Sequence, residues 1–93
     1  MKRYRNVVGK QLRERRNALG LSQSKLASAL QLSGLFYVDT TMIGKIESGI
    51  RSVYDYEVQF IAAALDTSVD SLLPPIQYTK GEIEELYGRD RDV

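Results

Sequence analysis

Residues 40–52, TTMIGKIESGIRS, carry hydrogen-bonding and cationic side chains at a spacing that suits contact with another molecule. Ile43, Ile46 and Ile50 recur with helical spacing and predict the buried side of a short helix. The opposite side would present Thr40, Thr41, Gly44 and Lys45. A glycine inside a helix costs about 1 kcal/mol relative to alanine. We therefore expect this face, which has small side chains and one charge, to lie close against a second molecule.

The residue types that most enzymes and metal sites need are missing from the chain. Its 93 residues include no cysteine and no histidine. This excludes disulfides, thiol nucleophiles, Ser-His and Cys-His catalysis, and ordinary zinc or haem sites. We expect no catalytic residue, no metal, no cofactor and no enzymatic activity.

The length favours one domain, and the apolar segments are short. None approaches the ~18 residues that a membrane-spanning helix needs, so we expect no membrane partner. The charged N-terminus lacks the apolar segment of a signal peptide. Together with the missing cysteines, these features favour a cytoplasmic protein.

Positive and negative charges are divided between the two halves of the chain. Residues 1–53 carry ten lysines and arginines and three acids, whereas residues 54–93 carry three bases and nine acids. The net charges of +7 and −6 account for the +1 of the whole chain. Unless helix surface charges produce this division by chance, it predicts one side that faces a polyanion and an opposite acidic side.

The apolar pattern predicts an all-α chain of five short helices and a tail helix. The expected ranges are 7–19, 22–33, 40–48, about 55–65 and 69–73, with the tail helix after Thr79. The N-cap candidates are Asn6, Ser22, Asp39, Asp55 and Ser68, and Thr79 and Glu82 have capping-box spacing. The expected inward residues are Val8, Leu12, Leu19, Leu26, Ala27, Leu30, Val58, Ile61, Ala62 and Leu65.

Two aromatic pairs lie outside these stripes. Phe36 and Tyr37 belong to the apolar run 35–38, which must partly turn inward; they either pack on the bundle or form a projecting surface. Tyr54 and Tyr56 flank Asp55. We expect one of these two to pack in the core, and the other could donate a hydrogen bond to a phosphate.

Three segments, GLSQSKLASAL, IGKIESG and IAAALDTSVDSLL, occur in an order and spacing that resemble the Cro/repressor-like helix-turn-helix regulators, also called the XRE family. The resemblance covers residues 7–73. It implies a compact five-helix lambda-repressor-like bundle, here with a short C-terminal tail helix, in which the second and third helices form the helix-turn-helix. We divide the chain into a DNA-binding domain, residues 1–75, and a tail, residues 76–93, for packing or dimerisation.

This chain departs from the family pattern at two places. The connection before Thr40 is about six residues longer than the usual turn. Asp39 occupies the start of the third helix, where a neutral or basic residue is more usual. The insertion at residues 31–39 could therefore change the placement of the following helix.

The resemblance implies double-stranded DNA as the partner, with the 40–48 helix in the major groove. The expected base-contacting residues are Thr40, Thr41, Gly44 and Lys45. The expected phosphate-contacting residues are Ser22, Gln23, Arg51 and Lys10. The resemblance makes the 40–48 helix the recognition helix, the one that reads the bases. By the same resemblance, Gln23 also braces a side chain of this helix. Glu47 should point away from the DNA and pair with Arg13 or Arg16.

The favoured function is a sequence-specific DNA-binding transcriptional regulator, a repressor that binds an operator as a homodimer. The dimer contact could use the fifth helix or an apolar patch of the tail, formed by Ile83, Leu86 and Tyr87. The alternative is an antitoxin-type protein-interaction module that also binds DNA. The acidic half, residues 54–93, would then contact a basic protein partner.

Overall fold

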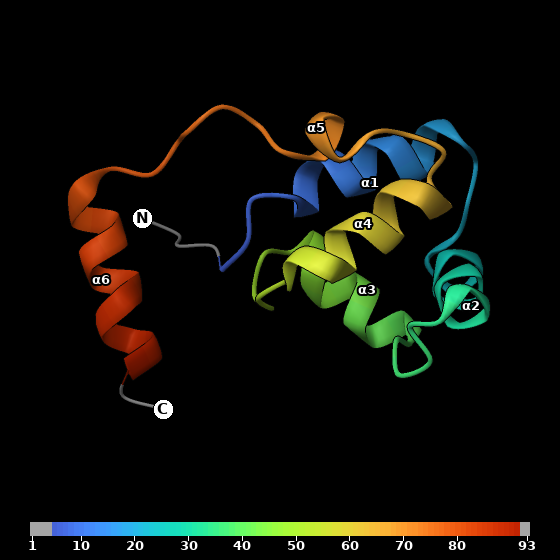
Figure 1. The fold of residues 1–93 in the computed structure, drawn as a ribbon, viewed down its shortest axis with the longest axis horizontal. Helices are drawn as coiled ribbons and strands as arrows, with labels where there is room; N and C mark the ends of the chain where they lie inside the picture. The colour runs from blue at the N-terminus through green and yellow to red at the C-terminus, as the bar shows by residue number, and fades with distance from the viewer. Residues whose placement is uncertain (1–4, 92–93) are drawn as a thin grey trace.

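The computed structural model describes residues 5–91, with side chains through residue 88, and this part of the chain contains helices and no strand (Figure 1). The helices are α1 (Gly9–Ala18), α2 (Gln23–Ser33), α3 (Thr40–Glu47), α4 (Asp55–Ala64), α5 (Val69–Leu72) and α6 (Lys80–Arg91). The prediction of an all-α bundle with a tail helix is confirmed.

Helices α1 to α5 surround one apolar core. Helix α2 packs on α3 and α4, α1 packs on α3 and α5, and α4 packs on α5. The buried apolar side chains are Val8, Leu12, Leu26, Ala27, Leu30, Leu35, Val38, Ile43, Ile46, Val58, Ile61, Ala62, Leu65 and Leu72. The inward residues predicted on the second, third and fourth helices are therefore confirmed, except that Ile50 lies exposed after α3 has ended.

Two details of α1 differ from the prediction. The helix begins at Gly9, two residues later than expected, and its N-cap is Val8 rather than the predicted Asn6. Asn6 Oδ1 lies before the helix and accepts hydrogen bonds from the N–H groups of Val8 (3.1 Å) and Gly9 (2.9 Å). Leu19 was expected in the core but is 42% exposed. The helix ends at Ala18, so the chain turns outward at Leu19 and Leu21 packs against the core instead.

The expected cap of α4 was also wrong. Asp55 is the first residue of the helix, and Tyr54 is its N-cap. The Tyr54 N–H donates to Glu57 Oε1 at 3.0 Å, so the acidic residue three positions into the helix satisfies this end. The expected caps Ser22, Asp39, Ser68 and Thr79 are confirmed, since each accepts a bond from the N–H three residues later.

The connection between α2 and α3 is partly buried. Leu35 and Val38 point into the core, whereas Phe36 is 82% exposed. The Gln31 side-chain amide donates to the Val38 carbonyl at 2.6 Å and closes the loop onto the end of α2. The run 35–38 therefore divides into two anchoring residues, a projecting Phe36, and Tyr37, whose hydroxyl turns inward to Glu57. The rings of Phe36 and Tyr37 meet edge to face with centroids 5.5 Å apart.

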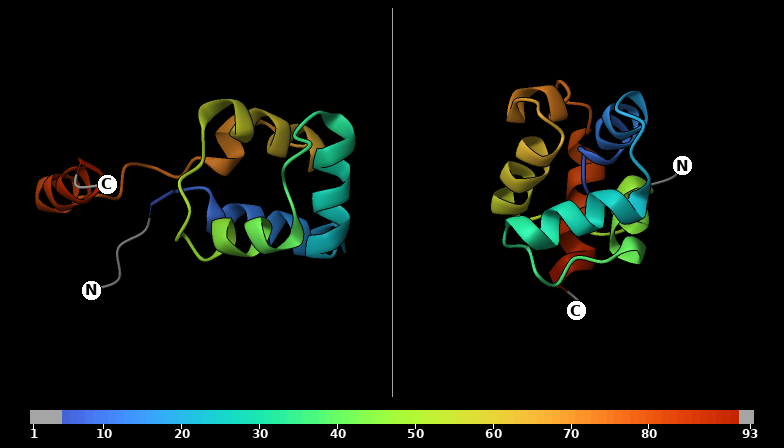
Figure 2. Two further views of the ribbon diagram at one scale, coloured as in Figure 1. Left: turned by 90° about the horizontal axis from the view of Figure 1, so that it is seen from below. Right: turned by 90° about the vertical axis from the view of Figure 1, so that its right-hand side faces the viewer.

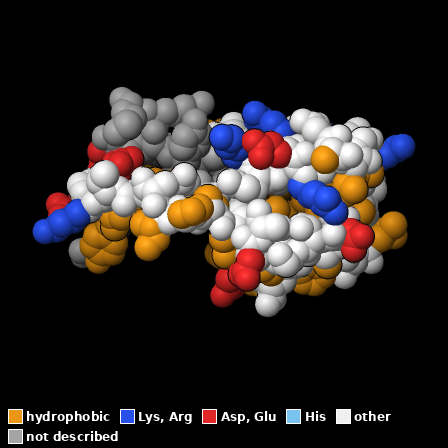
Figure 3. Space-filling model, turned by 90° about the horizontal axis from the view of Figure 1, so that it is seen from above, with side chains coloured by type: hydrophobic (Ala, Val, Ile, Leu, Met, Phe, Trp, Pro, Cys, Tyr) orange, Lys and Arg blue, Asp and Glu red, His pale blue; other side chains and the backbone are white. Residues whose placement is uncertain are grey.

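Helix α6 stands to one side of the bundle, at the end of an extended segment (Figures 1 and 2). Exposed apolar side chains accompany it: Leu73, Ile76, Ile83 and Tyr87. On the face shown in Figure 3, hydrophobic side chains lie on α6 and on the segment that leads to it. In the described part of the chain, no helix has the length and apolar character needed to cross a membrane.

Candidate nucleic-acid interface

Helix α3 presents the predicted outer face. Asp39 Oδ1 accepts the Met42 N–H at 2.8 Å, so a charged cap starts the helix. With Ile43 and Ile46 buried, the opposite face is left to Thr40, Thr41, Gly44 and Lys45; the two threonines and the lysine are exposed, and Gly44 is half-buried. This face can donate and accept hydrogen bonds and carries one cation, which suits readout of base edges.

The two glycines inside the bundle's helices have different surroundings. A Cβ on Gly9 would lie 2.3 Å from the Ile46 carbonyl oxygen, so α1 and α3 can cross this closely only with glycine there. A Cβ on Gly44 would meet only Gln23, at 3.8 and 3.9 Å, which is ordinary van der Waals contact. The chain's own packing therefore explains Gly9 and leaves Gly44 unexplained.

The first turn of α2 lies against the middle of α3. Ser22 is exposed, and its Oγ accepts the Lys25 N–H at 3.1 Å, so it acts as a cap in the free protein. Gln23 reaches across α3 and donates from Nε2 to Glu47 Oε1 at 3.1 Å. The expected bracing of a recognition-helix side chain by Gln23 is thus present, with Glu47 as the acceptor.

Glu47 accepts hydrogen bonds from side chains of two helices, α1 and α2, and its own side chain is 1% exposed. Arg16 donates from Nε to Oε2 at 2.6 Å and from Nη2 to Oε1 at 3.0 Å, and Arg13 donates from Nε to Oε1 at 3.3 Å. The predicted inward pairing of Glu47 is confirmed, with both arginines. The cluster ties α3 to α1 and α2 and removes a carboxylate from the outer face.

Arg51 does not extend into solvent. Its Nη1 and Nη2 donate to Glu57 Oε1 and Oε2 at 3.0 and 3.1 Å, and its side chain is largely buried. Its predicted phosphate contact stays a prediction, and in the free protein its role is structural.

The core position expected for one of Tyr54 and Tyr56 is wrong, because both are exposed and their rings stack on each other.

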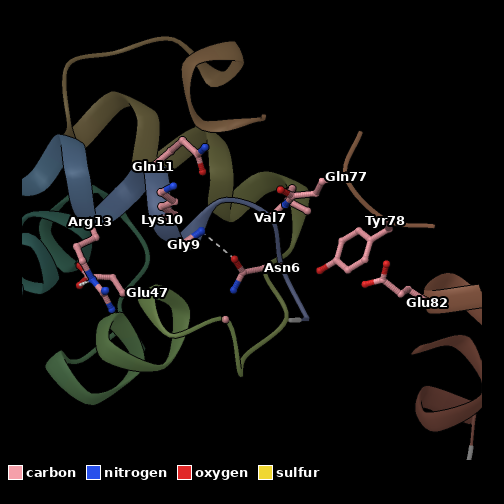
Figure 4. A pocket seen from close by; sticks show the side chains of 11 residues that line it. Asn6, Val7, Gly9, Lys10, Gln11, Arg13, Glu47, Gln77, Tyr78 and Glu82 are labelled. Atoms are coloured by element: carbon pink, nitrogen blue, oxygen red, sulfur yellow. Dashed lines mark hydrogen bonds and ion pairs between the residues drawn. The ribbon is translucent and has the colours of Figure 1, made fainter. Parts of the chain in front are cut away.

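Lys10 is exposed on α1 and lines an open hollow of about 480 Å³ beside α3 (Figure 4). Arg13 and Glu47 lie at one end of this hollow, and Tyr78 and Glu82 lie at the other. Lys10, Lys25 and Lys45 are exposed cations, whereas Arg13, Arg16 and Arg51 form internal ion pairs. At least three of the ten lysines and arginines counted in residues 1–53 are therefore paired within the bundle.

Two residues important for placing α3 were not recognised as such from the sequence. The sequence pattern assigns Gly9 no role beyond a position in the 7–19 helix, and Asn6 none beyond a cap. Asn6 Nδ2 also donates to the carbonyls of Ile46 (3.1 Å) and Arg51 (2.8 Å) and so ties the start of α1 to the end of α3. The one signal in the sequence for a close contact at Gly9 was a glycine in a segment whose other residues favour a helix.

Among the described residues, no group of acids is placed to hold a metal ion.

The two buried carboxylates predict how stability depends on pH. Burial raises the pKa of Glu47, but hydrogen bonds from Arg16, Gln23 and Arg13 and the charge of Arg16 outweigh it, so its pKa lies below the ordinary value. Burial also raises the pKa of Glu57, but hydrogen bonds from Arg51, Tyr37 and the Tyr54 N–H outweigh this effect. The pKa of Glu57 therefore lies below its ordinary value as well. Because both native pKa values lie below those of the unfolded chain, their contribution is complete above about pH 4.5 and is lost as pH falls through the native pKa values.

Urea unfolding between about pH 7 and about pH 3 measures this dependence. We expect the free energy of unfolding to fall on the acid side, and we expect Glu57→Gln to flatten that fall. Glu14→Gln, at an exposed position of α1, is the matched control and should leave the profile unchanged. A wild-type stability that stays constant down to the lowest pH would contradict the assignment.

Comparison with known proteins agrees with this geometry. The helix-turn-helix family model matches residues 12–72. The crystal structure of the restriction-modification controller protein C.AhdI from Aeromonas hydrophila is similar, with 35% sequence identity and a TM-score of 0.62 over 71% of this chain and 87% of that one. The DNA-binding domain of BldD is 25% identical, with a TM-score of 0.60 over 80% of this chain and 100% of that one. No curated protein sequence matches the chain.

The matched segment contains the whole of α2 and α3 and the residues that join them. It covers well over half of the chain. The resemblance seen in the sequence motifs, residues 7–73, ends within one residue of the matched segment. The chain therefore belongs to the XRE family of helix-turn-helix proteins.

Proposed function

We propose that the protein is a DNA-binding transcriptional regulator, a repressor that recognises a specific operator in double-stranded DNA. Helix α3 enters the major groove, and Thr40, Thr41, Gly44 and Lys45 face the base edges. The first turn of α2 and Lys10 approach the phosphates. The protein occupies a promoter and catalyses no reaction, and it acts in the cytoplasm, where its DNA lies.

The observation that carries the proposal is Gly44. A glycine inside α3 weakens the helix by about 1 kcal/mol relative to alanine. The free chain has room for a Cβ there, so its own packing does not require the glycine. A duplex lying against this face does supply a reason, because a glycine lets the helix backbone approach a ligand closely. The exposed threonines and Lys45 on the same face provide the hydrogen-bonding groups that readout needs. The structural likeness to a controller protein and to a DNA-binding domain supports the same function.

We propose a homodimer as the binding form. One small domain covers little DNA, so specific binding generally uses two domains on half-sites about one helical turn apart. The exposed Ile83 and Tyr87, with the half-buried Leu86, offer an apolar face on α6 for the dimer contact. Sedimentation of the protein with and without operator DNA tests this state.

The decisive test is fluorescence anisotropy with the duplex upstream of the protein's own coding sequence. A scrambled duplex of equal length is measured beside it, across about 50 to 200 mM salt. Tighter binding to the native duplex, with a steep loss of affinity as salt rises, is the expected result. Equal and weak binding to both duplexes would refute sequence-specific recognition.

Gly44→Ala is expected to separate folding from DNA binding. The added Cβ fits in the free protein, so stability should be unchanged or should rise by up to about 1 kcal/mol. Operator affinity should fall by about 1–3 kcal/mol, because the methyl group stands between the helix and the base edges. The measurement is anisotropy together with urea unfolding of the same variant. Unchanged operator affinity would mean that DNA does not lie against this face.

A protein partner is the second candidate, and the position of α6 favours it. This helix stands apart from the bundle and exposes apolar Ile83 beside the exposed acids Glu84 and Glu85. A basic protein encoded next to this chain, as in a toxin–antitoxin pair, would be the expected partner. Co-expression and co-purification of the two would show it, and α6 truncation should abolish the complex.

A further inference from the structure

One buried carboxylate receives bonds from the chain on both sides of the recognition helix. Glu57, on α4, is 2% exposed. Tyr37, in the connection before α3, donates its hydroxyl to Glu57 Oε2 at 2.5 Å. Arg51, in the loop after α3, donates to both carboxylate oxygens at 3.0 and 3.1 Å. Glu57 therefore joins the chain entering α3 to the chain leaving it.

Both attachment points lie close to the ends of α3. Tyr37 is two residues before Asp39, the N-cap of the helix, and its neighbour Val38 is buried and accepts a bond from Gln31. Arg51 is two residues after Gly49, whose φ of 81° turns the chain just beyond the C-cap Ser48. The Arg51 carbonyl accepts from Asn6, so this end is also tied to the start of α1. Only a few residues therefore separate each end of α3 from the residue, Tyr37 or Arg51, that binds Glu57.

The chemistry of the cluster suits a fixed geometry. A buried carboxylate is stable only when its lone pairs are satisfied by good donors. The guanidinium of Arg51 binds it with two parallel bonds, which also fixes orientation. The phenol of Tyr37 sits beside a negative charge, and hydrogen bonding to Glu57 together with burial raises the pKa of Tyr37, so it remains a donor at any physiological pH.

We propose that Tyr37 and Glu57 are positioning residues for α3: through Arg51 and Tyr37, Glu57 sets the angle at which the recognition helix presents its outer face. The lengthened connection then has a definite role, because it carries the phenol that reaches Glu57. The consequence for DNA rests on the proposed function, whereas the effect on α3 is a property of the free protein.

Tyr37→Phe tests the proposal, since it removes one hydroxyl and keeps the ring. Tyr54→Phe is the matched control, because it removes a phenol hydroxyl from an exposed ring in the same region. The first readout is amide hydrogen exchange of the free protein. Exchange at residues 39–51 should accelerate roughly tenfold to a hundredfold in Tyr37→Phe, as expected for the loss of a hydrogen bond to a charged group. Exchange in α1 and α2 should stay at the wild-type rate.

The second readout is anisotropy with the operator and the scrambled duplex. Tyr37→Phe should weaken operator binding roughly tenfold and leave the scrambled duplex unaffected, because contacts with phosphates carry little sequence information. Tyr54→Phe should leave the preference for the operator over the scrambled duplex unchanged, because a phosphate contact would affect both duplexes alike. A uniform rise in exchange across the bundle would overturn the proposal and make Tyr37 a general stability residue. Unchanged exchange at residues 39–51 would overturn it as well.

The two readouts keep this proposal distinct from the proposed function. If the wild-type protein showed no preference for any natural duplex, sequence-specific regulation would fail. A local rise in exchange around α3 in Tyr37→Phe would then still establish the positioning role. If the wild-type protein binds its operator and Tyr37→Phe binds it equally well with unchanged exchange, the positioning role fails and the regulator stands.

Discussion

Arg16→Met is expected to lower the free energy of unfolding by about 3–5 kcal/mol, because it breaks a buried ion pair from one side. Arg16 is 11% exposed and Glu47 is 1% exposed. The substitution removes two bonds to the carboxylate and a third from Nη1 to the Leu21 carbonyl at 2.7 Å. Methionine fills much of the space but donates nothing, so Glu47 stays buried with only Gln23 and Arg13 as donors. Urea unfolding followed by circular dichroism measures the loss.

Arg13→Met is the matched control at the same carboxylate. Arg13 is 53% exposed and makes one bond of 3.3 Å, so its removal should cost less than about 1 kcal/mol. The double variant Arg16→Met, Glu47→Leu should recover most of the loss, because a buried ion pair replaced by apolar residues is often neutral. Equal losses from the two arginine variants would show that burial does not decide the strength of this cluster.

Gly9→Ala is the second large effect that we expect, a destabilisation of about 1–3 kcal/mol. The new Cβ would lie 2.3 Å from the Ile46 carbonyl oxygen and 3.1 Å from that of Glu47, so backbone atoms of α3 must move. Alanine favours helix by about 1 kcal/mol over glycine, and that gain opposes the loss without cancelling it. The same movement should weaken operator binding, because it displaces α3 from α1.

Gly88→Ala is the control for this prediction. It makes the same chemical change in α6, where a Cβ would meet nothing within 4 Å. Its stability should stay at the wild-type value or rise slightly. The measurement is thermal and urea unfolding of both variants beside the wild type. A Gly9→Ala protein as stable as Gly88→Ala would show that α1 and α3 can separate without cost.

The apolar periodicity predicted most of the core, since a buried stripe follows directly from helical geometry. Leu19 shows where that reasoning stops. The residue lies on the stripe by spacing, but α1 ends one residue before it, and where a helix ends depends on the turn that follows. The late start of α1 has a similar origin, because it depends on which N–H groups Asn6 binds in space.

The candidate interface also has one part that the sequence predicted and one part that it did not. The exposed face of α3 was predictable, because two buried isoleucines determine which side chains remain outside. The pairing of Glu47 with arginines of α1 was predicted and is confirmed, but the partner of Arg51 was not predicted. Arg51 is near the family's phosphate-contacting loop in sequence, yet it binds Glu57 on α4. An ion pair between residues on different elements depends on how the helices pack, and charge counting does not contain that information.

The amino-acid sequence by itself determined the helical class, the family motifs and the outer face of α3, because these depend on local spacing along one helix. Only the tertiary structure decided that Gly9 permits the crossing of α1 and α3, that Glu47 gathers two arginines and Gln23, and that Glu57 joins both ends of α3. Each of these is a contact between residues distant in the chain. Their distances and burial arise only when the helices pack together, and the packing therefore decides which charges remain available to a partner.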